Sequence, residues 1–195
     1  MTAVRERVVF PKDWTFDLAE EMIETIGAEF DPADAVEELA RRIKGKPAAE
    51  AEPIAREYFA DYGRRWMDRT LELGERYNDR TYQVLKDAAA ATGELAFPLL
   101  PERFIEIAYL STQPLYSLPI AENTRHVFSY KMVFCDTFRA LEEKCGEVLA
   151  AALPCGAACL TACERAFSAH GFDVDVSQQS SLADGEFCQF IVRRR

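Results

Sequence analysis

The chain has 195 residues, of which 49% are hydrophobic and 29% charged, a composition typical of globular proteins and unlike that of disordered chains or coiled coils. The formal net charge is −10, and an acidic surface repels phosphate, so we expect neither nucleic acid nor a membrane among the partners. The N-terminus lacks the apolar segment of a signal peptide, and no run of about 18 apolar residues follows it. The sequence therefore predicts a cytoplasmic protein.

Helices are expected at the start of the chain. Apolar residues recur at helical spacing over residues 16–30, and Asp17 with Glu20 resembles a capping box. Asp31 followed by Pro32 predicts the start of a second helix, because aspartate caps well and proline suits the first helical position.

A long helical region is predicted over residues 53–92, with a break at Asn78-Asp79. Four prolines follow between residues 97 and 119, so we expect mostly ordered loop there, with one short helix around 104–110.

The pattern changes after Asn123. Residues 127–134 alternate between apolar and polar, which predicts a half-buried strand. Helix is expected from Asp136, divided at Pro154 and ending before Gly171, a C-terminal cap.

Two more strands are expected near residues 172–177 and 186–193, joined through a turn at Gly185. Separate helices and a short antiparallel sheet predict the α+β class: a helical N-terminal part followed by helices packed on the sheet. We expect one domain over residues 1–195, composed of a helical part (1–95), a proline-rich connection (96–123) and a mixed part (124–195).

All six cysteines lie in the last third of the chain, and we expect them to be reduced. Cys155, Cys159 and Cys163 are four residues apart, so a helix would place them on one face. That face is either a thiol-lined pocket wall or an ordinary core stripe, because free cysteine behaves as a small hydrophobe. Three thiols along a straight helix converge poorly on one ion, so no metal or cofactor is expected.

Cys135 is the first candidate nucleophile, because it precedes a predicted helix whose dipole would lower the thiol pKa. Cys188 on the last strand is a second candidate, and burial in the core is the alternative for both. His126 opens the strand that ends at Cys135 and is the candidate base.

Three charged side chains are candidates for substrate binding. Arg125 and Lys131 flank the same strand and could pair with an anionic substrate, and Glu164 follows Cys163 directly. Each is alternatively a solvated surface charge.

The last third of the chain carries a motif that extends from a cysteine through a Gly-Phe pair and a glycine turn to a Cys-x-Phe strand. Its members are Cys163, Gly171-Phe172, Gly185, Cys188 and Phe190. With Phe138-Arg139-Ala140-Leu141 before it, this region, about residues 127–193, resembles the end of the L-2-amino-thiazoline-4-carboxylic acid hydrolase-like family. It is also similar to the 4-vinyl reductase domain, a small-molecule-binding module.

The resemblance implies a hydrolase that opens a non-peptide C–N or C–S bond in a thiazoline-like carboxylate, with Cys163 and Cys188 carried over by motif position. One departure is that a family cysteine would fall near Met132, not at Cys135. The alternatives are a non-catalytic small-molecule or sensor module and a dimerisation domain. A homodimer is expected as a further partner.

Overall fold

The computed structural model describes residues 17–114 and 118–195 and confirms the α+β class. The helices are α1 (Glu20–Glu29), α2 (Pro32–Ile43), α3 (Ala48–Arg76), α4 (Arg80–Thr92), α5 (Leu99–Thr112), α6 (Asp136–Cys145), α7 (Glu147–Ala152) and α8 (Gly156–Ala169). The strands are β1 (Ile120–Asn123), β2 (Val127–Met132), β3 (Val174–Ser180) and β4 (Cys188–Arg194).

Helix α2 begins as the sequence predicts. The Asp31 carboxylate accepts hydrogen bonds from the backbone N–H groups of Ala33 and Asp34, at 2.8 and 3.1 Å, and Pro32 is the first helical residue. The capping box expected for α1 is wrong, because Ala19 occupies the capping position and has no side-chain acceptor.

The predicted break before α4 is also confirmed. The Asp79 carboxylate accepts the backbone N–H of Tyr82 at 2.9 Å and therefore caps α4, and it also pairs with Arg103 on α5.

Helix α5 corrects the expectation of a mostly irregular proline-rich connection. Pro98 precedes the helix and Pro101 lies in its first turn, where a missing N–H breaks no intrahelical hydrogen bond. Phe104, Ile105 and Ala108 are fully buried, so this helix belongs to the core.

The helical segment after Asp136 has one break that the sequence analysis missed. Gly146 adopts φ +79°, a conformation that glycine tolerates, and it separates α6 from α7 before Pro154 separates α7 from α8. The predicted end of α8 is confirmed, with Gly171 at φ +79°.

The four strands form one antiparallel sheet in the order β1-β2-β4-β3. The three predicted strands are confirmed, and β1 was missed because all four of its residues are exposed and carry no alternation. Strands β2 and β4 place Tyr130 opposite Phe190 and Met132 opposite Cys188.

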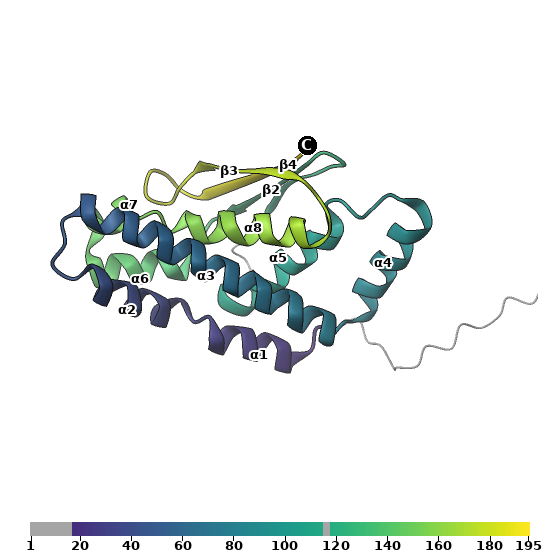
Figure 1. Cartoon of the computed structure of the whole chain (residues 1–195), viewed down its shortest axis with the longest axis horizontal. Helices are drawn as coiled ribbons and strands as arrows, with labels where there is room; N and C mark the ends of the chain where they lie inside the picture. Colours follow the sequence, from purple (N-terminus) through teal and green to yellow (C-terminus); the bar gives the residue numbers. More distant parts are fainter. Residues whose placement is uncertain (1–16, 115–117) are drawn as a thin grey trace, which may run out of the picture.

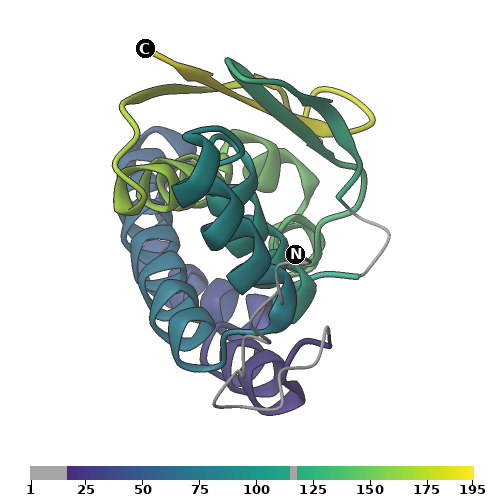
Figure 2. The same cartoon turned by 90° about the vertical axis from the view of Figure 1, so that its right-hand side faces the viewer.

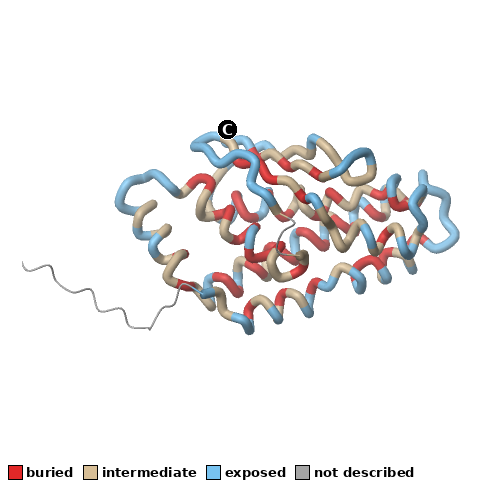
Figure 3. Tube along the Cα trace, turned by 180° about the vertical axis from the view of Figure 1, so that it is seen from behind, coloured by how far each residue is buried: buried red, intermediate tan, exposed pale blue. Residues whose placement is uncertain are grey.

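Helix α8 lies between the sheet and α3, with α1 and α2 farther from the sheet (Figure 1). Cys163 and Phe167 on α8 are fully buried, so the predicted packing through this stripe is confirmed. Viewed from the end, no described element covers the outer face of the sheet (Figure 2). Buried positions concentrate where the helices face one another and the inner sheet face (Figure 3).

The stretch Glu147–Ala169, which contains α7 and α8, has the length and apolar composition of a membrane span, with a mean hydropathy of 1.3 over its most apolar window. One third (33%) of that window is buried inside the protein, and core helices of soluble proteins pass the same test. The expectation of a protein without a membrane span stays a prediction.

Candidate functional site

Four of the six cysteines line one small cavity of about 40 Å³ between the helices and the inner face of the sheet. We call it the thiol cavity and define it by Cys135, Cys155, Cys159 and Cys188. Aromatic side chains complete much of its wall: Tyr62, Trp66, Tyr109, Phe138 and Phe190. The lining is therefore mainly apolar.

The four thiols reach the cavity from three local structures. Cys135 is the residue before α6, and Cys155 is the residue before α8. Cys159 lies one turn farther along α8, and Cys188 is the first residue of β4. The cavity thus forms where the starts of two helices meet the start of a strand.

Burial raises the pKa of the Cys135 thiol to about 11, although the backbone N–H groups of Thr137 and Phe138 at the start of α6 favour the thiolate. This corrects the expectation of a lowered pKa, since desolvation outweighs the helix N-terminus. Burial is also the main cause that raises the pKa of Cys155, Cys159 and Cys188. The four thiols are therefore neutral near pH 7.

Cys163 is buried one turn beyond the thiol cavity and does not line it, so two of the three cysteines expected at one cavity lie there. Its sulfur lies 3.0 Å from the Tyr130 hydroxyl, which in turn lies 3.0 Å from the Tyr109 hydroxyl. Burial raises the pKa of Cys163 to about 12. The thiol therefore serves as a hydrogen-bond partner inside the core.

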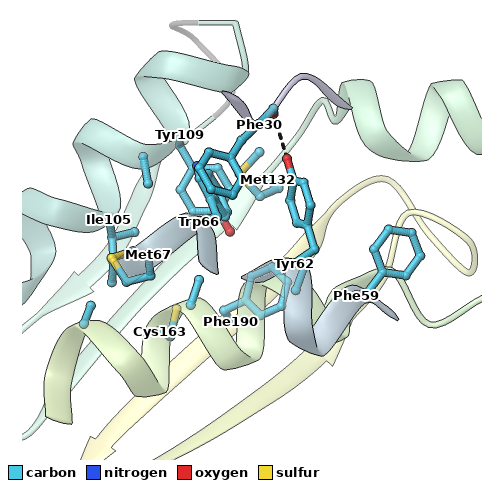
Figure 4. Packing of buried hydrophobic residues seen from close by; sticks show 14 of the residues in the cluster. Phe30, Phe59, Tyr62, Trp66, Met67, Ile105, Tyr109, Met132, Cys163 and Phe190 are labelled. Atoms are coloured by element: carbon cyan, nitrogen blue, oxygen red, sulfur yellow. Dashed lines mark hydrogen bonds between the residues drawn. The ribbon is translucent and has the colours of Figure 1, made fainter. Parts of the chain in front are cut away.

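Trp66 provides the one unsatisfied polar atom found in the cavity wall among the described residues. The side chain is 3% exposed, and its indole Nε1 is buried without a hydrogen-bond partner. The ring packs edge-on against Tyr109 with centroids 5.1 Å apart, and Figure 4 shows both rings with Met132. A buried unpaired donor costs about 1–3 kcal/mol, so this N–H favours an acceptor brought by a ligand.

A polar groove of about 440 Å³ adjoins the thiol cavity and opens more widely to solvent. Thr112 and Gln113, at the end of α5, line both spaces. The Gln113 side-chain oxygen accepts the backbone N–H of Asp136 at 2.8 Å, which connects the end of α5 to the start of α6. Gln113 therefore stands between the cavity and the groove.

The other predicted site residues lie away from the thiols. His126 and Arg125 are exposed in the loop between β1 and β2, where Arg125 lies 3.5 Å from Glu94. Lys131 points to the outer face of the sheet, 3.9 Å above the Phe187 ring, and Glu164 is exposed on α8. The structure therefore does not bring a base or a cation from this set to the cavity.

The aromatic wall was missed as a functional feature. The spacing of Tyr62 and Trp66 by four residues predicted a core face of a helix, which is correct, but spacing alone does not reveal an unsatisfied indole. Within the two described ranges, no three His, Cys, Asp or Glu side chains form a group that could hold a metal ion.

Comparison with known proteins adds no relative. No model of a protein family matches the chain, and no curated protein matches it significantly. The resemblance to the thiazoline hydrolase-like family therefore depends on the motif in the last third of the chain.

Proposed function

We propose that the protein is a non-catalytic binding or sensor module that takes the apolar end of a small molecule into the thiol cavity. The observation that carries this proposal is the buried Trp66 N–H, which lacks an acceptor in a mainly apolar wall. Ligand sites combine apolar walls with few polar groups that fix orientation. The ligand therefore carries a hydrogen-bond acceptor beside its apolar part.

The size of the cavity limits the ligand. About 40 Å³ accommodates only a few non-hydrogen atoms, whereas ordinary ligand pockets measure about 300–1,000 Å³. The adjoining groove of about 440 Å³ supplies room for the rest of the molecule if the Gln113 side chain moves aside. A small apolar end with a polar remainder fits this arrangement.

The thiols support binding better than nucleophilic catalysis. The thiolate is the reactive form, and burial raises the pKa of all four cavity thiols. Neutral thiols act as small, polarisable wall groups.

Acetone and 2-methylpropane test the proposal because both are small enough for the thiol cavity, have the same number of non-hydrogen atoms and differ in the carbonyl acceptor. In a Trp14→Phe background, Trp66 is the one remaining tryptophan, so its indole N–H gives a single NMR signal. We expect acetone to shift this signal in a saturable manner. Trp66→Phe keeps an aromatic ring without the donor. Because this variant has no indole signal, its affinity is measured by ligand-observed NMR, as for the unmodified chain, and ketone binding should be about five-fold weaker, the value of one hydrogen bond.

2-Methylpropane serves as the control, and Trp66→Phe should leave its binding unchanged. Failure of both molecules to bind would contradict the proposed function. Equal affinity for both in the unmodified chain would contradict the role of the indole donor.

The hydrolase hypothesis keeps one observation in its favour, which is that Cys135 and Cys188 share a cavity wall. Turnover of a 2-aminothiazoline carboxylate that disappears in Cys135→Ser or Cys188→Ser would support hydrolysis in place of binding. The roles of His126, Arg125 and Lys131 in such a reaction stay predictions, as do the cytoplasmic location and the homodimer.

A further inference from the structure

A second cavity, of about 610 Å³, lies at the opposite end of β2 from Met132 and shares no lining residue with the thiol cavity. Its walls are formed by the segment before α5 and by the loop between β1 and β2. Phe172, which precedes β3, and Arg194, the last residue of β4, complete them. The volume falls in the range of ordinary small-molecule sites.

Arg194 brings an unneutralised positive charge to this cavity. Its guanidinium carbon lies 5.3 Å from the centre of the Phe172 ring and 5.9 Å from that of Phe97. No ion pair to Arg194 occurs among the described residues, whereas the next residue, Arg195, pairs with Asp173 and Asp175. In a chain of net charge −10, a cation held over aromatic rings without a carboxylate partner favours an anionic ligand.

Arg125 supplies a second guanidinium from the loop between β1 and β2. Its side chain is 78% exposed and lies 3.5 Å from Glu94, the one acidic residue found in the described lining. An exposed pair of this kind contributes little free energy, so a better-placed anion can replace Glu94.

The segment before α5 forms an apolar wall beside the two cations. Phe97 is buried, and Ala96 and Pro98 extend the surface. Leu95 has φ +63°, a conformation that non-glycine residues adopt rarely and at an energetic cost. Strained backbone of this kind is enriched at functional sites, and here it belongs to the apolar wall of the cavity.

We propose that this cavity binds a small aromatic oxyanion, with its carboxylate or phosphate between Arg125 and Arg194 and its ring against Phe97 and Phe172. Guanidinium groups bind both carboxylate and phosphate through paired N–H donors, and the phenyl rings bury the apolar part of the ligand. The proposal is independent of the thiol cavity.

Calorimetric titration of the full chain with 2-naphthoate, 2-naphthyl phosphate and the neutral 2-naphthylmethanol tests the proposal. We expect both anions to bind and the alcohol to bind at least ten-fold more weakly; the tighter anion identifies the preferred head group. Arg194→Gln should weaken anion binding at least ten-fold, and Arg125→Gln at least three-fold.

Arg193→Gln is the matched control, because it removes the same charge from the neighbouring residue of β4, on the outer face of the sheet. It should change the affinity less than two-fold. An equal loss of anion affinity in Arg193→Gln and Arg194→Gln would overturn the proposal. Equal affinity for the alcohol and the anions would overturn it as well. Inorganic phosphate binding as tightly as naphthyl phosphate would overturn the aromatic part of the proposal.

Discussion

Burial controls the ionisation of individual side chains in this protein, and Glu102 on α5 shows this outside the thiol cavity. The residue is 7% exposed, and its carboxylate accepts a hydrogen bond from the side-chain amide of Asn123. Burial, with a smaller effect from the charge of Glu106, raises the pKa of Glu102 to about 7 from 4.5. Ionising this carboxyl therefore costs folding free energy.

The folded state binds the Glu102 proton more tightly than the unfolded chain does. The contribution of the protonated carboxyl to the free energy of unfolding is therefore fully present below about pH 4.5. The contribution is lost as the pH rises towards 7. A rise from 4.5 to about 7 corresponds to about 3 kcal/mol. We predict that Glu102→Gln, which keeps an acceptor for Asn123, is more stable than the unmodified chain by about 2 kcal/mol at pH 8 and nearly equal at pH 5.

Urea unfolding at the two pH values measures this difference. Glu164→Gln, which removes the same charge from an exposed position on α8, is the control for the loss of one negative charge. A gain from Glu102→Gln of the same size at pH 5 and pH 8 would show that its ionisation is not the cause.

At the scale of the helices, the close approach of α3 and α8 gives the thiol cavity part of its shape. A Cβ atom added at Gly63 would lie 2.1 Å from the carbonyl oxygen and 2.7 Å from the Cα of Ala158. Ala158 also lines the thiol cavity, so this contact holds one wall in place. The glycine that weakens helix propensity is thus required by packing.

Gly63→Ala should destabilise the fold by about 2 kcal/mol, since overpacking of the backbone outweighs the gain of about 1 kcal/mol in helix propensity. Chemical unfolding measures the change. Gly185→Ala is a control of the same chemistry, because the nearest atom to its added Cβ lies 3.7 Å away. If Gly63→Ala were more stable than the unmodified chain, the two helices would not be in contact there.

For the whole molecule, stability comes from one continuous cluster of buried apolar side chains that includes residues from the helices and the sheet. All six cysteines are free, as expected from their distribution along the chain. We predict that a reducing agent leaves the melting temperature unchanged within a few degrees, because no covalent crosslink contributes. Calorimetry with and without dithiothreitol measures this, and a clear drop on reduction would contradict it.

Local sequence patterns were sufficient wherever neighbouring residues decide the structure. Asp31-Pro32 predicted the start of α2, and Asp79 predicted the break before α4, because capping depends on the next few backbone N–H groups. Alternation predicted β2, β3 and β4. It failed for β1, since an exposed edge strand depends on backbone pairing with β2 and not on a buried face.

The sequence by itself determined the α+β class, the extents of α2 and α4, and the presence of a thiol stripe on α8. The tertiary structure alone decided which thiols line one cavity. Cys188 lines it together with Cys135 because β4 pairs with β2, whereas Cys163 lies one helical turn beyond the cavity on α8. It also decided that Arg125 lines the same cavity as Arg194 and not the thiol cavity. The physical reason is that the loss of solvent around a side chain, and the side chains it meets, depend on all the groups packed against it. Those groups come from segments far apart in the chain.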